Sequence, residues 1–422
     1  MNEESILAAR EDRLTHIRNH LGPNEAIICI KANIPGEYKN SKEAYTLLSI
    51  FNIECQQDYI ILDKEFVESA DGPYILIKTP IDANIKKNLI DIETNHPLGR
   101  MIDLDYYVSD EKSVTRQSLG LSPRKCYLCN RDAIQCIREK THSDKRIFTY
   151  IQTQVYAYVQ DIIEHLVIRS IKRELDLEHK FGLVTPSSNG SHLDMNYTLM
   201  MRSAKALLFS FTQMFWIGFD GISLETIYAQ GKKQGLAAEK LMYDVTNDVN
   251  TYKGLIFILG LALMSGGYAI SHQQTLDGLF DNIRIMTKNI FEESNYQTFG
   301  EKAYREYQIG GAREEAYRGY PTVKKAMNTL LEAPIIDDEV LHMTLIDIIG
   351  STDDTVLVKR AGSLEAYRRY KNLITNIKTY DLKTIIEVTE ECIRGNISCG
   401  GAADILITAL FLVDFSRKLL IA

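Results

Sequence analysis

The sequence predicts two domains, a mixed α/β domain followed by an all-α domain. The first part of the chain contains short apolar runs rich in β-branched residues, such as Ala26–Ala32 and Tyr74–Lys78. From Ile147 onward, apolar residues recur at three- and four-residue spacing, which is typical of helices. Six of the nine prolines precede residue 150, and the other three fall between helical stretches. Because a domain usually has about 100–200 residues, 422 residues favour two.

The first domain is expected to contain four strands and two helices. The strand Arg100–Val108 alternates apolar and acidic residues, as a strand with one polar face does. The expected strands are Ala26–Ala32, Tyr59–Leu62, Tyr74–Lys78 and Arg100–Val108, and the expected helices are Ser41–Phe51 and Ala83–Asn95.

The second domain is expected to be helical throughout. We place the domain boundary between Lys145 and Arg146, which gives domains 1–145 and 146–422. The expected helical stretches are Ile147–Leu175, Leu193–Phe219, Leu236–Val245, Leu255–Tyr268, Leu276–Phe291, Val323–Leu331, Asp338–Ile349, Ser363–Asn376, Leu382–Arg394 and Ala402–Leu420.

Composition excludes several classes of protein. The 48 basic and 56 acidic residues give a net charge of −8, which disfavours non-specific binding to nucleic acid. Seven cysteines, an odd number at irregular spacing, argue against a disulfide framework. The N-terminus lacks a basic region followed by an apolar run, and the most apolar stretch, Gly254–Ile270, is short for a membrane span and contains internal glycines. We therefore expect a cytoplasmic protein whose Gly254–Ile270 stretch is a buried helix.

Asp103 and Asp105 form the sharpest local signal in the first domain. Positions two apart on a strand face the same side, so these carboxylates can hold Mg²⁺ together with substrate phosphates. Gly99 permits close backbone approach, and Arg100 can clamp a phosphate. The alternative is a solvated strand face, because a D-x-D pattern alone is weak evidence.

A second signal follows in the CxxC pair Cys126 and Cys129, with Cys136 and His142 downstream. Three thiolates and an imidazole can form a tetrahedral Zn²⁺ site. The alternative is a set of reduced cysteines packed in a helix and turn. Three basic residues that flank the cysteine pair can meet a polyphosphate, although each alone is typical of a surface charge; they are Arg116, Arg124 and Lys125.

The run HPLGRMIDLD at 96–105, followed by SLGLSPRKCYLCNRDAIQCIREKTHS at 118–143, closely resembles the apo-citrate lyase phosphoribosyl-dephospho-CoA transferase family. The resemblance covers roughly residues 1–145, and Lys125 stands where that family commonly has Arg. It implies a nucleotidyltransferase-like fold. It also implies transfer of a phosphoribosyl-dephospho-CoA group to a serine of the citrate lyase acyl carrier protein, with release of pyrophosphate. Asp103 and Asp105 would then serve as catalytic, metal-binding carboxylates.

The second domain has no GxxxxGK[ST] loop and no GxGxxG turn. Polar residues gather instead where five loops run into helices, which favours a central polar site ringed by helix starts. In the first loop, the alternative is that Ser191 or Asp194 only caps the helix. The five elements are Lys180–Met195, Asn250–Gly254, Gly310–Pro321, Asp353–Gly362 and Asn396–Asp404.

In order, these elements resemble the triphosphoribosyl-dephospho-CoA synthase family, from about residue 150 to the C-terminus. The implied substrates are ATP and 3′-dephospho-CoA. The 2′-hydroxyl of dephospho-CoA would attack the anomeric carbon of the ATP ribose, adenine would leave, and the triphosphate would be retained.

The resemblance assigns roles to residues of all five elements. Carboxylates would stabilise a positively charged ribose and accept the hydroxyl proton, for which the candidates are Asp194, Asp354 and Asp404. His192 would protonate adenine or only hydrogen-bond a loop. Mg²⁺ and cations would hold the triphosphate. The expected binding residues are Lys180, Asn250, Lys253, Gly254, Arg313, Arg360, Asn396, Gly400 and Gly401.

The second domain departs from the family pattern at seven positions. The departures leave three possibilities, an active enzyme, one with altered preference, or a degenerate domain, and we favour the active one. They are Phe181 for Pro, Tyr252 for His, Phe299 for His, Glu314 for Gly, Val356 for Asn, Ala361 for Gly and Cys399 for Pro.

The sequence therefore predicts a fusion of two transferases that act in turn on the citrate lyase prosthetic group. Its expected partners are nucleotides and the acyl carrier protein, without nucleic acid or membrane. One alternative is an active first domain with a helical half that only binds dephospho-CoA or serves as a scaffold. The others are a nucleotide hydrolase and a zinc-dependent interaction protein.

Overall fold

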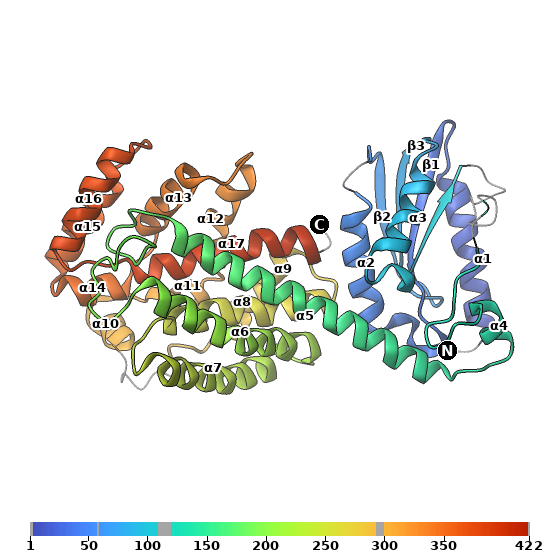
Figure 1. Cartoon of the computed structure of the whole chain (residues 1–422), viewed down its shortest axis with the longest axis horizontal. Coiled ribbons are helices and arrows are strands. Elements are labelled where there is room, and N and C mark those ends of the chain that lie inside the picture. The colour runs from blue at the N-terminus through green and yellow to red at the C-terminus, as the bar shows by residue number, and fades with distance from the viewer. Residues whose placement is uncertain (1–2, 57–58, 109–119, 121, 293–298, 421–422) are drawn as a thin grey trace. The chain divides into compact units, whose positions relative to one another are not determined.

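The computed structural model of the chain describes residues 3–56, 59–108, 120, 122–292 and 299–420 (Figure 1). The chain divides into two compact units, of which unit 1 consists mainly of residues 1–161 and unit 2 mainly of residues 162–417. This division falls inside α5 (Asp144–Asp176), whose first residues include the boundary expected from the sequence. Each unit has its own core and is described by itself.

Unit 1 is built on a four-stranded antiparallel sheet in the order β2-β3-β1-β4. The first domain is therefore α/β, as predicted, whereas the nucleotidyltransferase-like fold stays a prediction. Its elements are α1 (Glu3–His20), β1 (Glu25–Ala32), the 3₁₀ helix η1 (Gly36–Asn40), α2 (Lys42–Glu54), β2 (Asp63–Val67), β3 (Tyr74–Pro80), α3 (Ile85–Asn95), the 3₁₀ helix η2 (Gly99–Met101), β4 (Ile102–Tyr107) and α4 (Ala133–Arg138).

Helices cover both faces of this sheet and one of its edges. Helix α1 packs on one face, where Ile17 meets Ile27, Cys29 and Leu76. Figure 1 shows α2 on the opposite side of the sheet. Helix α3 covers the edge strand β4, since Lys86 Nζ donates to the carbonyl of Leu104 at 2.8 Å. An edge strand covered in this way cannot pair with another chain.

The expected elements of the first domain are largely confirmed. The strand expected at Tyr59–Leu62 is wrong, because β2 begins only at Asp63. The apolar side chains that suggested it, Ile60 and Leu62, are 71% and 51% exposed, so their hydrophobicity does not reflect a core position. Helix α1 was not expected, and few apolar residues in its sequence mark a buried face.

Unit 2 is all-α, as predicted. Each of the ten expected helical stretches overlaps a helix, but Leu193–Phe219 begins before the helix at Tyr197–Asp220 and Leu276–Phe291 continues past the helix at Leu276–Met286. The short α10, α11 and α14 and the first half of α7 were not foreseen. With α5, its helices are α6 (Tyr197–Asp220), α7 (Leu224–Thr246), α8 (Lys253–Ser271), α9 (Leu276–Met286), α10 (Phe299–Tyr307), α11 (Gly311–Tyr317), α12 (Pro321–Glu332), α13 (Asp338–Ser351), α14 (Thr355–Ala361), α15 (Leu364–Thr375), α16 (Leu382–Arg394) and α17 (Gly400–Leu419).

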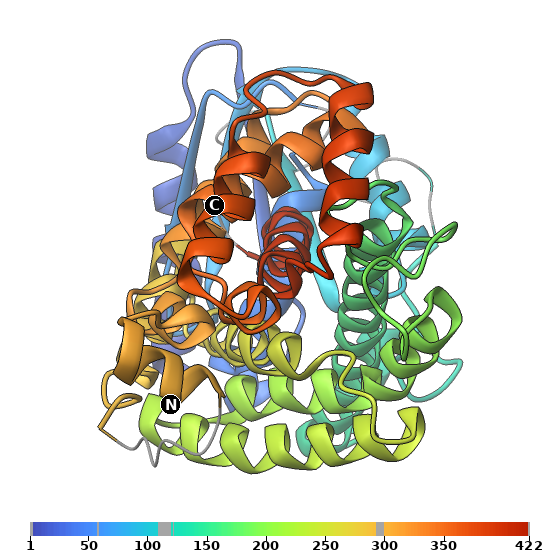
Figure 2. The ribbon, with the colours of Figure 1, turned by 90° about the vertical axis from the view of Figure 1, so that its left-hand side faces the viewer.

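Helices α8 and α17 form the centre of unit 2. Figure 2 looks along α17, shown in red, and other helices surround it. The apolar side chains of α17 from Ile405 to Phe415 are buried. Helix α8 is long and apolar enough to cross a membrane, but 83% of its apolar window is buried inside the structure. This burial identifies α8 as a core helix, as the sequence predicted.

Candidate active sites

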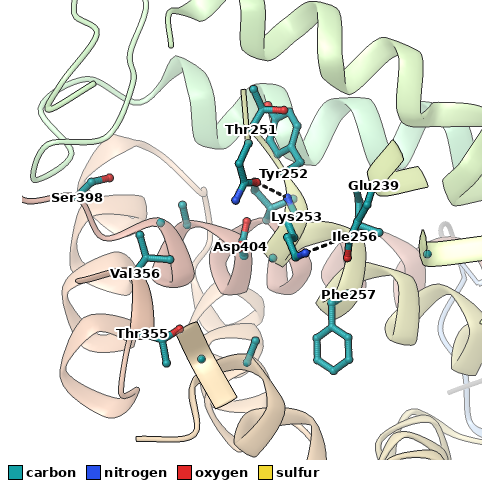
Figure 3. Close-up of a pocket in the computed structure, with 18 of the residues that line it drawn as sticks. Glu239, Thr251, Tyr252, Lys253, Ile256, Phe257, Thr355, Val356, Ser398 and Asp404 are labelled. Carbon is teal, nitrogen blue, oxygen red and sulfur yellow. Dashed lines mark hydrogen bonds and ion pairs between the residues drawn. The ribbon is translucent and has the colours of Figure 1, made fainter. Parts of the chain in front are cut away.

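Residues from all five loop-and-helix elements line one cavity of unit 2 (Figure 3). Its volume is about 1080 Å³. Sites for drug-sized ligands measure about 300–1000 Å³, so this cavity has room for a nucleotide substrate. The expected site residues that line it are His192, Asp194, Asn250, Lys253, Gly254, Arg313, Arg360, Asn396, Gly400 and Asp404.

The start of α8 forms one wall of the cavity. Asn250 caps this helix, because its Oδ1 accepts the backbone N–H of Lys253 at 3.1 Å. The Lys253 ammonium extends along the wall to Glu239 Oε2 of α7, 2.7 Å away (Figure 3). Gly254 lies against Asp404, and a Cβ at this position would overlap Asp404 Oδ2. The glycine therefore lets an acidic side chain approach the positive end of the α8 dipole.

The surroundings of Asp404 strongly change its acidity. Burial, and then the nearby carboxylates of Asp354 and Glu174, raise the pKa of Asp404 well above its usual value. A carboxylate with a raised pKa holds a proton more tightly than an ordinary one, which suits it to accept a proton. Glu174 also lines the cavity and was not singled out from the sequence. Nothing in its helical pattern within α5 distinguishes it from a structural acid.

Asp354 lies behind the cavity wall. It caps α14, because its Oδ1 accepts the N–H groups of Val356 at 2.7 Å and Leu357 at 3.1 Å. Its Oδ2 accepts the N–H of Ala402 at 3.3 Å, at the start of α17. A Cβ on Gly401 would lie 2.8 Å from Asp354 Oδ1. Asp354 and Gly401 thus fix two helix starts against each other, and their predicted contact with substrate stays a prediction.

A hydrogen-bonded cluster connects His192 to Arg360, Asn396 and Ser398. Arg360 donates to His192 Nδ1 at 2.8 Å and to Asn396 Oδ1 at 3.1 Å. His192 Nδ1 is therefore an acceptor, which leaves Nε2 to donate to Ser398 Oγ at 3.0 Å. Burial and then the Arg360 charge lower the pKa of His192 to about 4. The neutral ring is better suited to fixing this loop than to protonating a leaving group.

Asn196 caps helix α6. Its Oδ1 accepts the N–H of Leu199 at 2.9 Å. The capping alternative considered for Ser191 and Asp194 is therefore wrong. Asp194 is exposed at the cavity, where it is free to meet a ligand.

Three of the expected phosphate-binding cations are already paired, namely Lys253 with Glu239 and two others. Lys180 is fully buried, and its Nζ lies 2.7 Å from Glu174 Oε1. Glu174 lines the cavity, whereas Lys180 lies behind the wall and supports Glu174. Arg313 lines the cavity itself and pairs with the buried Glu301 at 2.8 Å.

Phe181 adopts a backbone conformation that its family counterpart, proline, cannot. Its φ is +51°, whereas proline is fixed near −65°. Its backbone N–H donates to Thr389 Oγ1 at 3.2 Å, a bond that proline lacks. The ring is fully buried. The departure at Phe181 therefore reflects a different local path of this loop, stabilised by its own hydrogen bond and packing.

Tyr252 lines the cavity where the family usually has histidine. Its side chain is buried, and its hydroxyl oxygen has no hydrogen-bond partner within the described structure. Burial and then the nearby Glu174 and Asp404 raise its pKa well above the usual value, so the hydroxyl keeps its proton. A buried donor without a partner is costly unless a ligand supplies an acceptor.

The remaining departures are compatible with the fold. Ala361 is the last residue of α14, and only the next residue, Gly362, needs a positive φ, of 72°. Glu314 lies inside α11, and the buried Cys399 directly precedes α17. Val356 lines the cavity with an apolar side chain where an amide is usual. The Phe299 side chain lies outside the described residues.

The acidic pair of unit 1 lies on the α1 face of the sheet. In the register of β1 and β4, Asp103 pairs with Lys31 and Asp105 pairs with Cys29. The two carboxylates therefore share a face, as predicted. Burial and then the charge of Asp103 raise the pKa of Asp105. Arg124 forms an ion pair with Asp103 and lies 2.5 Å from Glu93 Oε1. These contacts hold the Asp103 carboxylate in place.

Gly99 and Arg100 both contact neighbouring segments of unit 1. A Cβ at Gly99 would lie 2.6 Å from carbonyl oxygens of α3, so close packing requires glycine here. Arg100 donates to the carbonyl of Lys125 at 3.0 and 2.6 Å and lies over the ring of Tyr127. Its third nitrogen, NH1, is buried without a partner among the described residues. Arg116 lies outside the described residues.

A basic cluster on the same face was missed by sequence reasoning. The carboxylate of Asp71, with 0% exposure, binds four cations, two of them from α1. Its distances are 3.2 Å to Arg10, 2.9 Å to Arg13 and 3.1 Å to Lys39, and Lys31 forms the fourth pair. These residues are scattered between positions 10 and 71, so no local motif announces them.

The charges of this basic cluster, defined as Arg10, Arg13, Lys31, Lys39 and Asp71, do not balance. Four cations share one carboxylate, which leaves an excess of positive charge. Burial, followed by repulsion from Arg13 and Lys39, lowers the pKa of Lys31 to about 8. Such an excess is well suited to a multiply charged anion.

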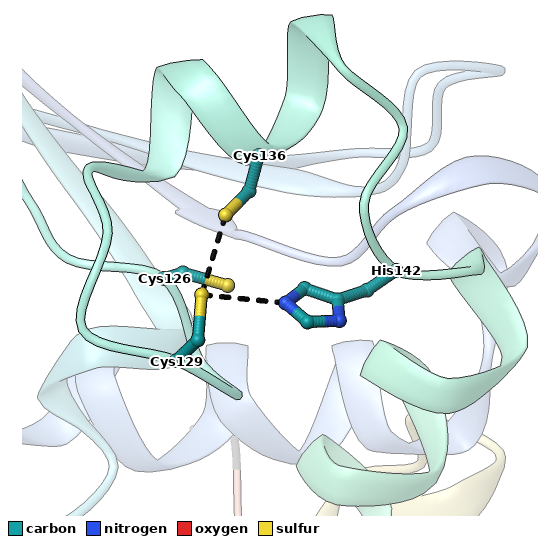
Figure 4. Close-up of side chains that lie close together, drawn as sticks. All are labelled: Cys126, Cys129, Cys136 and His142. Atoms are coloured by element: carbon teal, nitrogen blue, oxygen red, sulfur yellow. Dashed lines mark hydrogen bonds between the residues drawn. The ribbon is translucent and has the colours of Figure 1, made fainter.

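The cysteines and the histidine predicted to bind zinc also lie close together in unit 1. Ligand atoms of Cys126, Cys129, Cys136 and His142 all lie within 4.8 Å of one another. Figure 4 shows the three thiols and the imidazole pointing to one point. All seven cysteines of the chain are free thiols.

Comparison with known proteins identifies two families in this chain. The model of the apo-citrate lyase phosphoribosyl-dephospho-CoA transferase family matches residues 1–158, and that of the ATP:dephospho-CoA triphosphoribosyl transferase family matches residues 160–420. Protein CitXG of Leuconostoc mesenteroides subsp. cremoris is 31% identical over 98% of this chain and 97% of its own length. This chain belongs to the CitXG family.

Further relatives agree with the assignment of the two parts. Protein CitXG of Haemophilus influenzae is 28% identical over 98% of this chain and 96% of its own length. The 2-(5''-triphosphoribosyl)-3'-dephosphocoenzyme-A synthase of Haemophilus ducreyi is 30% identical over 68% of this chain and 99% of its own length. The CitXG assignment makes the chain a bifunctional transferase, which makes the prosthetic group of citrate lyase and attaches it, as the sequence predicted.

Proposed function

We propose that unit 2 makes the prosthetic-group precursor and unit 1 attaches it. In this assignment unit 2 converts ATP and 3′-dephospho-CoA into 2′-(5″-triphosphoribosyl)-3′-dephospho-CoA and adenine. Unit 1 then transfers the phosphoribosyl-dephospho-CoA group to a serine of the apo acyl carrier protein and releases pyrophosphate. The observation that carries the proposal is the cavity of unit 2, in which all five elements of the synthase pattern meet.

The first reaction exchanges one bond at the anomeric carbon of the ATP ribose. The 2′-oxygen of dephospho-CoA bonds to this carbon while the bond to adenine breaks. The hydroxyl proton passes to a base, and adenine takes up a proton from solvent or a nearby acid. Since positive charge develops on the ribose, a carboxylate beside it stabilises the transition state.

Asp404 is the best placed base among the three candidate aspartates. It lies on the cavity wall against the start of α8, and its raised pKa makes it a stronger proton acceptor than an ordinary carboxylate. Asp194 faces the same cavity from another loop and can stabilise the ribose charge. Asp354 acts through the two helix starts that it holds, so we assign it a positioning role.

The retained triphosphate needs cations on the wall of the cavity. Lys253, Arg313 and Arg360 reach it from three different elements. The starts of α8 and α17 add backbone N–H groups and the positive ends of two helix dipoles. His192 holds Arg360 in place through the contact at Nδ1. Lys180 supports the site from behind through Glu174.

Tyr252 supplies a hydrogen-bond donor to the substrate in this site. Its hydroxyl is buried, keeps its proton and has no partner among the described residues. An acceptor on adenine or ribose would satisfy it. Tyrosine can thus replace the donor function of the family histidine, which supports activity despite this departure.

The second reaction exchanges one phosphorus–oxygen bond in unit 1. The carrier serine oxygen bonds to the α-phosphorus, the bond to pyrophosphate breaks, and the serine proton passes to a base. Asp105 is the proposed base, because burial and then the Asp103 charge raise its pKa and it lies beside Asp103 on the same face of the sheet. The basic cluster around Asp71 lies on the same face and can hold the departing pyrophosphate.

The chemistry of both donor sets fits Mg²⁺. Asp103 and Asp105 share one face, and burial and then the charge of Asp103 raise the pKa of Asp105, so a bound cation would stabilise this pair of carboxylates. Asp194 and Asp404 offer carboxylate oxygens in the cavity of unit 2. When bound, Mg²⁺ would neutralise phosphate charge at these carboxylates. A cytoplasmic location agrees with seven free cysteines.

The assignment of two reactions to two sites is tested with two variants of the full chain. Asp404→Asn should lose adenine release but still load the carrier when supplied with the triphosphoribosyl precursor. Asp103→Asn should release adenine but leave the carrier unloaded. A mixture of both variants should restore loading from ATP and dephospho-CoA. Unchanged adenine release in Asp404→Asn, or unchanged loading in Asp103→Asn, would refute the assignment.

A further inference from the structure

The cysteine cluster of unit 1, defined as Cys126, Cys129, Cys136 and His142, has the geometry of a structural metal site. Cys129 Sγ lies 3.4 Å from Cys136 Sγ and 3.4 Å from His142 Nε2. Tetrahedral coordination with zinc–sulfur bonds of about 2.3 Å separates ligand atoms by about 3.5–3.8 Å. The four ligand atoms therefore already surround a volume that suits one zinc ion (Figure 4).

The backbone around the CxxC pair is shaped to present both thiols. A tight hairpin holds it, in which Cys126 N–H donates to the carbonyl of Arg131 at 2.8 Å and Ala133 N–H donates to that of Arg124 at 2.9 Å. The N–H of Leu128 points at Cys126 Sγ, 3.5 Å away. Arg131 also hydrogen-bonds Cys129 Sγ. Donors directed at cysteine sulfur stabilise thiolates, the form that binds a metal.

The segment that carries the cluster has almost no core of its own. Among residues 122–143, all of which the structure describes, only Cys136 is buried. The two isoleucines of α4, Ile134 and Ile137, are 56% and 71% exposed. The alternative of reduced cysteines packed as small hydrophobic residues therefore lacks the apolar neighbours that it requires. A segment of this kind is typically held by a metal.

We propose that Cys126, Cys129, Cys136 and His142 bind one structural Zn²⁺ that positions Arg124 beside the acidic pair of unit 1. Three thiolates and one imidazole form a donor set that selects zinc over Mg²⁺. Arg124 lies two residues before the first ligand and forms ion pairs with Asp103 and Glu93. The same hairpin supplies the Lys125 carbonyl that binds Arg100.

The positioning role rests on the proposed transferase function of unit 1, whereas metal binding does not. If zinc fixes the hairpin, loss of the metal frees Arg124 and Arg100 together. Carrier loading should then fall while adenine release by unit 2 stays unchanged. Zinc content measures the first part of the proposal, and the contrast between the two activities measures the second.

Metal content of the purified full chain is the first test. Elemental analysis should find about one zinc per chain in the wild type and in Cys392→Ala, which changes a free cysteine of unit 2. Cys129→Ser and His142→Ala should lose most of it. Absence of zinc from protein produced in zinc-supplemented medium, the presence of iron instead, or retention of zinc in Cys129→Ser would overturn the proposal.

A second measurement covers the case in which these variants fail to fold. Wild-type protein stripped with a chelator and titrated with Co²⁺ should develop thiolate-to-cobalt absorption and the intense visible bands of a tetrahedral site at one equivalent. Added Zn²⁺ should abolish these bands. A titration without thiolate bands would contradict the site. Unchanged carrier loading in stripped, folded protein would refute the positioning role and leave the metal site intact.

Discussion

The two proposed active sites differ in how the groups that would bind polyphosphate are arranged. In unit 1, the charged groups are paired with one another, as Arg124 is with Asp103 and the four cations of the basic cluster are with Asp71. In unit 2, a cavity of about 1080 Å³ also contains ion pairs, such as Lys253 with Glu239, but its wall includes the buried Tyr252 hydroxyl, which has no partner among the described residues. A substrate therefore competes with existing ion pairs in both units, whereas only unit 2 adds a preformed cavity with an unpartnered donor.

This difference matches the substrates. In the proposed assignment, unit 1 acts on a large protein substrate. Unit 2 would act on two nucleotides and would need to shield a charged ribose from water, which a lined cavity does well. We therefore expect the activity of unit 1 to respond most to substitutions that change a charge. The activity of unit 2 should respond most to the loss of a single side chain that lines the cavity.

The largest expected effect is that of Asp404→Asn on unit 2. Loss of a general base typically costs about 10²–10⁴-fold in rate. Because burial and neighbouring acids raise the pKa of Asp404, the wild-type rate should increase with pH through a range above that of an ordinary carboxyl group. The rate of adenine release by the wild type, measured against pH, should show this increase. Asp414→Asn changes an acid outside the cavity and is the matched control, so an equal loss there would contradict the role of Asp404.

Phe181→Pro should have the next largest effect, on stability. Proline cannot adopt the φ of +51° and removes the hydrogen bond to Thr389. A misplaced proline costs about 3 kcal/mol. Urea unfolding of the variant should show this loss, whereas Phe181→Leu should lose only packing. A Phe181→Pro protein as stable as the wild type would mean that the loop follows the same path as in the rest of the family.

Lys31 should make anion binding by unit 1 sensitive to pH. Its pKa is lowered to about 8, so it loses its proton as the pH rises from 7 to 9, and the basic cluster then loses one charge. Pyrophosphate inhibition of carrier loading should weaken several-fold over this range, relative to Lys31→Arg, which stays charged. The same pH dependence in both proteins would exclude Lys31 as its source.

The smallest expected effect is that of Tyr252→Phe in unit 2. The hydroxyl has no partner in the free protein, so its removal should leave the free energy of unfolding unchanged or slightly higher. The KM for one nucleotide substrate should rise about five- to tenfold, as expected for the loss of one hydrogen bond. Tyr252→His should restore part of the affinity. Reduced stability with unchanged KM would assign the hydroxyl a structural role.

Sequence reasoning succeeded where the information is local. Helical spacing located the long helices, and alternation in Arg100–Val108 placed Asp103 and Asp105 on one face. The four residues of the cysteine cluster lie within 17 residues of sequence, so their spacing alone indicated that they lie close together.

The sequence could not reveal groups assembled by tertiary contacts. Asp71 gathers cations from α1, β1 and η1, and no pattern links these positions. Asp354 and Lys180 match family motifs, yet both turn out to lie behind the cavity wall. A motif identifies which residues are near a site, but only packing decides which of them faces the ligand.

The central claim, that unit 2 is an active synthase despite its departures, is tested most directly by mass spectrometry of the full chain incubated with ATP, 3′-dephospho-CoA and Mg²⁺. The account predicts free adenine and a product with the mass of triphosphoribosyl-dephospho-CoA. Neither should form with the Asp404→Asn variant. Folded wild-type protein that forms neither adenine nor the new mass would contradict the claim and leave unit 2 without synthase activity.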